Sequence, residues 1–259
     1  MRFPLNGKYT VNDVFLERKR TYIKKRIKLP KGIDRAKVLK LISEYKRQLE
    51  ENGTPTTRLY SKTIEKSTGS IVLIEDFYIK NLEIELGRTP RTKVEKYFVQ
   101  MLRIVDRNYI FGKFPKTIVE VKPSNFLLDC DKIIYCDLVP PRVIKNRKIS
   151  GKQLDFTYKN DKSKLKELRF RFISKEGALY YMILHAAAVR PDMLNYFIRA
   201  SLNNIENKQM KTRIKKLINS ESFHTEMVRL EPFYRKRRTA YLKFMRMMAA
   251  QGASSQLFH

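Results

Sequence analysis

The sequence has no long apolar run. No stretch of about 18 uninterrupted apolar residues occurs, so we expect no membrane-spanning helix. The first residues, MRFPLNGKYT, lack the apolar segment of a secretory signal, and the expected location is therefore cytoplasmic. With 42% hydrophobic residues, the 259-residue chain can still bury the core of one large domain or two smaller lobes.

Cysteine and histidine are also scarce. The only cysteines, Cys130 and Cys136, flank one short segment and could close a small disulfide. Because two cysteines in a chain with no recognisable leader are more often free thiols, we expect them to be free. None of the three histidines is spaced with a cysteine as zinc ligands are, so a structural zinc site is not expected.

Acidic residues are few, and the charge of the chain is its strongest compositional signal. Fifty-five Lys and Arg stand against 26 Asp and Glu, which gives a net charge of +29. Such a field attracts polyanions, namely nucleic acid, anionic lipid head groups, phosphorylated glycans or nucleotides, although a solvated lysine-rich surface would carry the same charge. The basic residues gather at Arg18–Lys28, Arg142–Lys152, Lys159–Arg171, Lys208–Lys216 and Arg235–Arg246.

The first third of the chain reads as strands around a single helix. Asp34 is the expected N-cap of a helix that ends near Glu51, because apolar residues recur there at helical spacing. Short apolar runs predict strands at Tyr9–Val11, Tyr22–Ile27, Thr57–Tyr60 and Ser70–Phe77.

The remainder is predicted to be mainly helical. Two short strands are expected around a turn at Asp129–Lys132, and Lys145–Lys166 reads as a polar, lysine-rich loop. Helices are predicted at Thr92–Tyr109, Lys175–Val189, Asp192–Asn203, Lys208–Asn219 and Glu231–Ala250. The expected fold class is therefore α+β, with a β-rich N-terminal lobe containing one helix at residues 1–78 and a mainly helical C-terminal lobe at residues 79–259.

One polar run between two apolar strands carries the main functional signal. It reads VEVKPSNFLLD at residues 119–129 and is followed by IIYCDL at residues 133–138. Glu120 and Asn125 have the spacing of D-x-x-x-x-N, the loop with which protein kinases position an acceptor hydroxyl and bind magnesium. Residues 122–125 read KPSN, and Asp137 follows the next apolar strand, where a second metal-binding aspartate is expected.

These residues resemble the protein-kinase-like superfamily, which includes aminoglycoside, choline and lipopolysaccharide-core kinases. The resemblance covers roughly residues 8–202. The bulky residue before Ile23-Lys24, the IVLIEDF run and the segment GALYYMILHAAAVRPDMLNYFIRA look most like bacterial lipopolysaccharide core kinases. The resemblance implies a two-lobed protein-kinase-like fold that binds ATP and Mg²⁺ in its cleft.

It also implies a role for each matching residue. Glu120 would position or deprotonate the acceptor hydroxyl, and Lys122 would contact the γ-phosphate. Asn125 and Asp137 would hold magnesium, and Lys24 would contact the α- and β-phosphates.

Two further roles belong to the N-terminal lobe. Glu44 would brace Lys24 through an ion pair, and backbone groups from Glu75 to Phe77 would hydrogen-bond adenine. Other residues nearby leave alternatives open, because Lys25, Arg26, Lys28, Glu50 and Glu51 carry the same charges.

Three departures from the family pattern stand out. Glu120 replaces the catalytic aspartate, and displacement of its carboxylate by about 1 Å can cost on the order of 100-fold in rate. Only Gly7 lies near the first strand, so the glycine-rich phosphate loop is missing, and Leu138-Val139 replaces Phe-Gly after Asp137.

The function expected is ATP- and Mg²⁺-dependent phosphoryl transfer to a hydroxyl of a sugar or glycoconjugate. The partners expected are ATP and a polyanionic or glycan acceptor, with peripheral contact at an anionic inner membrane face. One alternative is a protein kinase or a pseudokinase that acts as a binding scaffold. Another is a nucleic-acid-binding protein on a degenerate kinase-like fold, although no RNA-binding motif accompanies the basic stripes.

Other polar and aromatic residues have plainer expected roles. His185 is expected to be a packed helix residue, not a base, and Arg142 either reaches an anionic acceptor or faces solvent. The aromatic residues Tyr180, Tyr181, Tyr196 and Phe197 recur at helical spacing and are expected in the core.

Overall fold

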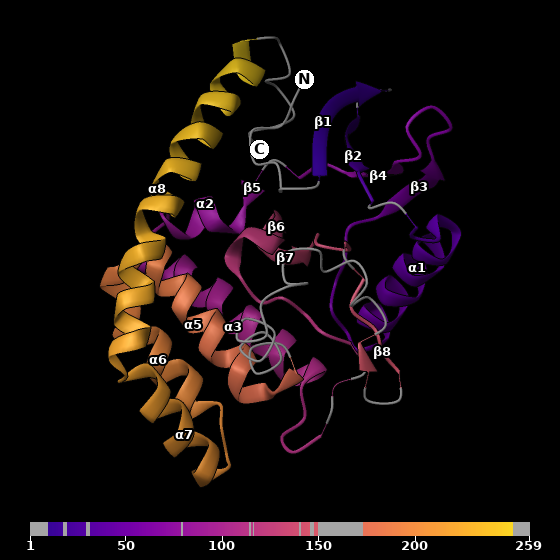
Figure 1. Cartoon of the computed structure of the whole chain (residues 1–259). Coiled ribbons are helices and arrows are strands. Elements are labelled where there is room, and N and C mark those ends of the chain that lie inside the picture. The colour runs from indigo at the N-terminus through magenta and orange to yellow at the C-terminus, as the bar shows by residue number, and fades with distance from the viewer. Residues whose placement is uncertain are drawn as a thin grey trace.

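The structure is a computed structural model that describes residues 10–17, 20–29, 32–78, 80–113, 115, 117–139, 141–145, 148–149 and 173–250. These residues form an α+β fold in which most strands precede most helices along the chain, as Figure 1 shows. Gly7 and most of the predicted loop Lys145–Lys166 lie outside the described residues.

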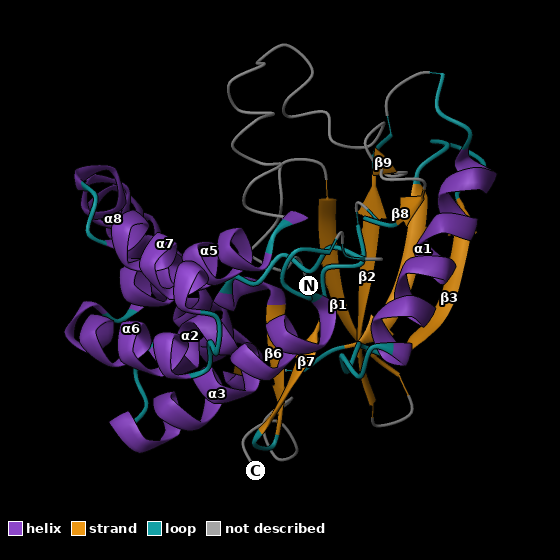
Figure 2. Ribbon diagram, turned by 90° about the horizontal axis from the view of Figure 1, so that it is seen from below, coloured by secondary structure: helices purple, strands orange, loops and turns teal. Residues whose placement is uncertain are grey.

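A four-stranded antiparallel sheet and one helix form what we call the sheet region. The strands lie in the order β1-β2-β4-β3, so that β2 and β4 are the two central strands. Helix α1 lies beside this sheet in Figure 2, and its buried residues Val38, Ile42, Tyr45 and Leu49 recur at helical spacing. The elements are β1 (Thr10–Glu17), β2 (Arg20–Ile27), α1 (Arg35–Glu51), β3 (Leu59–Ile64) and β4 (Ile71–Asp76).

A second, three-stranded sheet follows, with the strand order β5-β6-β7. Its central hairpin joins β6 and β7 at the turn where Cys130 adopts a positive φ of 51°. Short elements surround it: β5 (Lys80–Asn81), α2 (Leu82–Leu86), η1 (Pro123–Asn125), β6 (Phe126–Asp129), β7 (Lys132–Tyr135), β8 (Ile144–Lys145) and β9 (Lys148–Ile149).

The longer helices form what we call the helical region. Helix α5 is its centre, because every residue from Glu176 to Ala188 is buried. Around it lie α3 (Arg91–Asn108), η4 (Pro191–Met193), α6 (Leu194–Asn203), α7 (Lys208–Ile218) and α8 (Glu221–Ala250), with α5 itself at Lys175–Val189.

One hydrophobic core runs through both regions. It joins residues such as Ile42 and Leu73 of the sheet region to Phe98 and Leu184 of the helical region. Hydrogen bonds join the three-stranded sheet to the sheet region, since Thr57 N donates to Tyr135 O at 3.1 Å and Tyr135 N donates to Pro55 O at 2.8 Å. The β6–β7 hairpin is therefore tied to the sheet region through its backbone.

Helix α8 is the longest described element, and it starts earlier than the sequence predicts. The expected start at Glu231 is wrong, because the helix begins at Glu221 and continues through Pro232 without a break. In Figure 1, α8 runs along one side of the molecule from the bundle of α5 and α6, past α2, to the level of β1. It contacts both α5 and α2.

Most other boundaries agree with the expectation, but β1 extends to Glu17 instead of Val11, and β3 lies at Leu59–Ile64 instead of Thr57–Tyr60. Helix α5 has the predicted bounds, Asp34 caps α1 by accepting from Lys37 N, and the β6–β7 hairpin turns where predicted. Both cysteines are free thiols, as expected. The short helix α2 was not predicted. Within the described residues, no helix has the length and apolar character needed to cross a bilayer.

Candidate functional site

The loop that carries Glu120 is held in place by buried tyrosines. Tyr109 donates its hydroxyl to Val119 O and accepts from Val119 N, both at 3.0 Å. The Tyr135 hydroxyl accepts from Glu120 N at 3.4 Å. Lys122 N then donates to Glu120 O at 2.9 Å, which turns the chain into η1 and toward Asn125. These contacts fix the backbone of residues 119–122.

The structure brings Asn125 and Asp137 together. Asn125 Nδ2 donates to Asp137 Oδ2 at 3.2 Å and to the backbone oxygen of Glu120 at 3.1 Å. Cys136 N also donates to Asn125 O at 2.9 Å, so the strand before Asp137 is fixed against the loop. Because both hydrogen bonds use Nδ2, the amide oxygen of Asn125 is the atom that faces away from these partners.

The lysine that reaches this pair from the sheet region is Lys25. Its Nζ donates to Glu75 Oε2 at 2.9 Å and to Cys136 O at 2.8 Å, directly before Asp137. Burial lowers the pKa of Lys25, but Glu75, Cys136 and Asp137 together outweigh burial and raise the pKa above its ordinary value. Lys25 is therefore a permanently charged group between the two regions.

Lys24, for which the phosphate contact was predicted, lies on the opposite face of β2. Successive residues of a strand point to opposite faces, so Lys25 shares its face with the buried residues Ile23 and Ile27, and Lys24 does not. Glu44 accepts a hydrogen bond from Gln48 on its own helix at 3.3 Å. The expected pair of Lys24 with Glu44 is thus replaced by Lys25 with Glu75. The alternation of Ile23, Lys25 and Ile27 follows this face, but the basic residues Lys24 and Arg26 on either side of Lys25 mask it in the sequence.

Glu75 contributes its side chain to the site, in addition to the backbone for which a role was predicted. Its backbone lies in a central strand, where it pairs with Ile23 on one side and Leu59 on the other. The carboxylate is fully buried and also accepts from Thr57 Oγ1 at 2.7 Å. Phe77, the other residue predicted at this position, follows the end of β4 and packs partly buried against Ile23 and its neighbours.

Glu120 is surrounded by hydrogen-bond donors. Lys122 Nζ and the Tyr181 hydroxyl contact its Oε1 at 2.8 and 3.0 Å, and Arg142 contacts its Oε2 at 3.1 Å. Burial would raise the pKa of this carboxyl, but Lys122 and Arg142 outweigh burial and hold the pKa far below its ordinary value. Glu120 is therefore a carboxylate that stays ionised and is a weak base. Arg142 was expected either to reach an anionic acceptor or to face solvent, and in the structure it forms an ion pair with Glu120.

Asp137 has the opposite electrostatic environment. Burial and the neighbouring charge of Glu120 raise its pKa to about 6, against the attraction of Lys122, Arg142 and Lys25. A carboxyl group with this pKa is mostly ionised at neutral pH and gains from a further cation nearby. The groups gathered here, which we call the charged cluster, are Lys25, Glu75, Glu120, Lys122, Asn125, Asp137 and Arg142.

A chain of aromatic contacts leads from Glu120 through α5 to α8. Tyr181, which donates to Glu120, has its ring 4.1 Å from that of His185, and His185 Nδ1 is hydrogen-bonded to the Tyr234 hydroxyl. His185 is thus a packed helix residue, as expected. The contact of the Tyr181 hydroxyl with Glu120 was not predicted, because helical spacing indicates that a residue is in the core but does not indicate the partner of its hydroxyl group.

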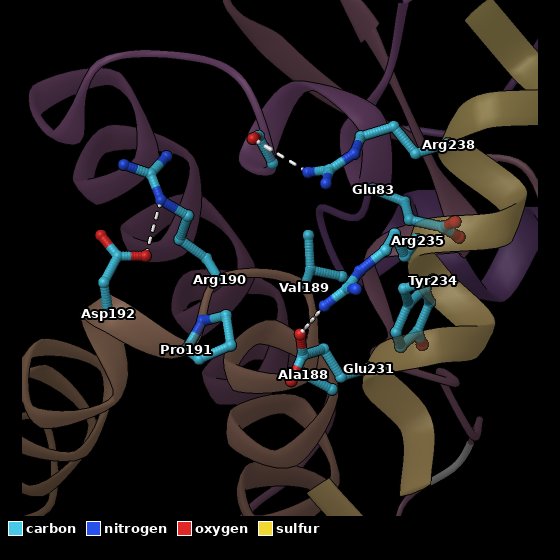
Figure 3. Close-up of a pocket in the computed structure, with 11 residues that line it drawn as sticks. Glu83, Ala188, Val189, Arg190, Pro191, Asp192, Glu231, Tyr234, Arg235 and Arg238 are labelled. Atoms are coloured by element: carbon cyan, nitrogen blue, oxygen red, sulfur yellow. Dashed lines mark hydrogen bonds and ion pairs between the residues drawn. The ribbon is translucent and has the colours of Figure 1, made fainter. Parts of the chain in front are cut away.

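Tyr234 also lines a cavity of about 260 Å³ between α2, η4 and α8. Figure 3 shows Arg190, Arg235 and Arg238 around it. These cations are already engaged, because Arg190 contacts Asp192 at 2.9 Å, Arg235 contacts Glu231 at 2.5 Å and Arg238 donates to Gly87 O at 3.1 Å. None of the residues predicted for the site lines this cavity.

The charged cluster fits a metal that is shared with a ligand better than one held by protein alone. Among the described residues, no group of three or more His, Cys, Asp or Glu side chains could hold a metal ion. Magnesium, however, is usually bound by one or two carboxylates together with substrate phosphates. Asp137 and the amide oxygen of Asn125 supply a donor set of that kind.

No protein-family model and no curated protein sequence matches the chain.

Proposed function

We propose that the protein is an ATP- and Mg²⁺-dependent phosphotransferase with a two-lobed, protein-kinase-like fold, acting on a hydroxyl of a sugar or glycoconjugate. One observation carries the proposal. Three chain segments, namely β2, residues 120–125 and residues 136–137, bring Lys25, the Asn125–Asp137 pair and the Lys122–Glu120 pair into one cluster. These are the groups that phosphoryl transfer requires, because its catalysis is mainly positioning and charge stabilisation.

The charges of the cluster favour a phosphate chain bound together with a divalent cation. Lys25, Lys122 and Arg142 are cations, and they face the carboxylates of Glu75, Glu120 and Asp137. A triphosphate would add negative charge to a cluster that is already balanced. Magnesium held by Asp137 and Asn125 would supply the counter-charge and stabilise the transferring phosphoryl group. Lys25 would contact the phosphates nearest the sheet region, and Lys122 would contact the terminal one.

In this proposal Glu120 positions the acceptor hydroxyl and does not remove its proton. The lowered pKa makes it a weak base, and its two oxygens are oriented by Lys122, Tyr181 and Arg142. A carboxylate fixed in this way can accept a hydrogen bond from a hydroxyl and aim it at the terminal phosphate. This role tolerates glutamate in place of aspartate as long as the surrounding donors fix the carboxylate.

A negatively charged acceptor agrees with the exposed face of the helical region. Helix α7 exposes four basic residues, and the outer face of α8 adds more. Such a surface would retain a phosphorylated glycan or bring the protein to an anionic membrane face. The exposed basic residues are Lys208, Arg213, Lys215, Lys216, Arg229, Arg235, Lys236, Lys243 and Arg246.

A nucleotide-binding pseudokinase is the second candidate. The ion pair of Arg142 with Glu120, at 3.1 Å, favours it, because it neutralises the carboxylate that an acceptor would need. The two candidates share the phosphate and magnesium contacts and differ only in turnover.

The proposal is tested by turnover of Mg–ATP with a panel of sugar and glycoconjugate acceptors. We expect phosphorylated acceptor with the wild-type protein and none with Asp137→Asn, because the metal ligand is lost. Asp131→Asn is the matched control, since Asp131 lies at the β6–β7 turn and pairs only with side chains of α3 in the described structure. Mg–ATP binding without transfer to any acceptor would favour the pseudokinase, and Asp137→Asn with wild-type binding would contradict both.

A further inference from the structure

The cavity between α2, η4 and α8 has a buried inner wall and an exposed rim. Its inner wall includes Glu83, Ala188 and Tyr234, with exposed fractions of 1%, 1% and 4%. At the rim, the side chains of Asp192 and Arg235 are 62% and 69% exposed, so the cavity is open to solvent on that side. Its volume of about 260 Å³ lies just below the about 300–1,000 Å³ of pockets for drug-sized ligands and suits a smaller molecule.

The three arginines that line the cavity differ in their partners. Arg190 and Arg235 each form an ion pair with a carboxylate of the same cavity. Arg238 forms no ion pair within the described residues, and its hydrogen bond goes to the neutral backbone oxygen of Gly87. In Figure 3, Arg238 extends toward the cavity from α8, and Arg190 lies on the opposite side. Arg238 is therefore the guanidinium group whose charge the cavity leaves unbalanced.

The remaining carboxylate of the cavity does not neutralise Arg238. This carboxylate is Glu83, and its two oxygens accept from Arg237 Nε at 3.1 and 3.2 Å. Arg237 is not part of the cavity lining. Each carboxylate of the lining thus has an arginine partner other than Arg238. A cation without a counter-charge in the wall of a cavity attracts an anion into it.

The guanidinium group of Arg238 also keeps hydrogen-bond donors available. Its Nη1 donates to Gly87 O at 3.1 Å, whereas Nε and Nη2 have no hydrogen-bond partner in the described part of the chain. Guanidinium groups bind oxyanions through two parallel N–H donors, and Nε with Nη2 is such a pair. The lack of a side chain at Gly87 makes room for this arrangement, because a Cβ there would lie 2.4 Å from Arg238 Nη1.

We propose that this cavity binds a small hydroxylated molecule with a single oxyanion group, such as a sugar monophosphate or a sugar carboxylate, and that Arg238 binds the oxyanion. The carboxylates of Asp192 and Glu231 have acceptor capacity beyond their arginine partners, so they accept hydrogen bonds from hydroxyl groups and disfavour a second anionic group. The site is independent of the proposed function, because the aromatic contacts of α5 with α8 lie between the cavity and Glu120.

Calorimetric titration with glucose 6-phosphate and with glucuronate tests the proposal, with glucose as the neutral control. We expect one-to-one binding of at least one of the two anions, the tighter of which identifies the oxyanion, and no measurable binding of glucose. Arg238→Gln should weaken the binding of that anion at least about tenfold. Arg246→Gln is the matched control, because it removes the same charge from an exposed position of the same helix. Absence of binding by both anions, or equal affinity of the two variants, would overturn the inference.

A second variant displaces the guanidinium group of Arg238 and keeps its charge. The φ of Gly87 is −75°, which residues with a side chain adopt readily, so Gly87→Ala is expected to fold. Its added Cβ forces Arg238 Nη1 away, and we expect the same anion to bind at least about tenfold more weakly. Asp137→Asn should bind it as the wild type does. Wild-type affinity in Gly87→Ala would contradict the inference, and loss of binding in Asp137→Asn would also overturn it by placing the anion at the charged cluster.

Discussion

The two ends of one strand face in β2 have opposite characters. At Lys25 the neighbours are carboxylates, an amide and backbone oxygens contributed by β4, the 119–125 loop and the residues after β7. At Ile23, two residues away, the neighbours are the apolar side chains of α2 and α8. The first end is the charged cluster, and we call the second, formed by Ile23 with Ile84, Tyr241 and Phe244, the aromatic cluster.

The two ends differ in the kind of side chain that can cover them. Apolar side chains of the same chain can fill the aromatic cluster, because burial of rings stabilises the fold without requiring partners. Charged groups cannot be covered in this way, because each needs an opposite charge or a hydrogen bond. The charged cluster therefore consists of paired groups, Lys25 with Glu75 and both Lys122 and Arg142 with Glu120.

Removal of the charge that the sheet region contributes to the charged cluster, that of Lys25, should have the largest effect on the free energy of unfolding. Lys25→Met leaves the fully buried Glu75 carboxylate without its cation, and we expect the free energy of unfolding to fall by about 3–5 kcal/mol. Lys24→Met, one residue away on the other face, should change it by less than about 1 kcal/mol. Chemical denaturation of both variants measures the difference, and equal losses would show that the face assignment of β2 is wrong.

The raised pKa of Asp137 predicts a pH dependence of stability. Between pH 4 and 6 the folded state holds a proton on Asp137 that the unfolded state has lost, because burial raises the pKa to about 6 in the folded state. Folding in this interval therefore takes up a proton, which becomes less favourable as the pH rises, so the contribution of Asp137 to stability falls by up to about 1.4 kcal/mol per pH unit.

Glu120 acts in the other direction. Its folded pKa is lowered, so its stabilisation is lost only as the pH falls below its ordinary value of 4.5. Denaturation of wild type and Asp137→Asn from pH 4 to 7 isolates the contribution of Asp137. The wild type should lose stability relative to the variant as pH rises, and parallel curves would exclude the shift.

Tyr181 offers a smaller test within the charged cluster. Tyr181→Phe removes one donor from Glu120 and keeps the ring that packs on His185. If Glu120 positions the acceptor, we expect turnover to fall about tenfold, or about 1.4 kcal/mol, with little change in ATP affinity. Tyr180→Phe, on the same helix, is the control. Identical turnover in the two variants would mean that the hydroxyl of Tyr181 has no part in fixing Glu120.

Local patterns predicted the elements that hold the site. The cap at Asp34, the bounds of α5 and the β6–β7 hairpin followed from spacing and turn residues. The pair of Asn125 and Asp137 followed from a motif whose two parts are joined by that hairpin. These contacts join residues that are close together in the sequence, and the elements between those residues largely set their geometry.

The long-range contacts of the site were not predictable in the same way. The choice of Lys25 over Lys24 depends on which face of β2 is buried, and the basic run Lys24–Arg26 hides the alternation that would reveal it. The pairing of α8 with Ile23 joins residues more than 200 positions apart, for which the local sequence of neither segment carries a signal. The predicted start of α8 was wrong for a local reason. Proline is frequent at the first position of a helix, so Glu231-Pro232 resembles a helix start, whereas Pro232 lies inside α8 in the structure.

Calorimetric titration of Mg–tripolyphosphate tests whether Lys25, Asn125 and Asp137 hold a phosphate chain with its metal, as we propose. We predict saturable one-to-one binding to the wild type and to Asp131→Asn, and at least about 100-fold weaker binding to Asp137→Asn, because one of the two proposed metal ligands is lost. Equal binding to Asp137→Asn and Asp131→Asn would show that Asp137 does not hold the metal.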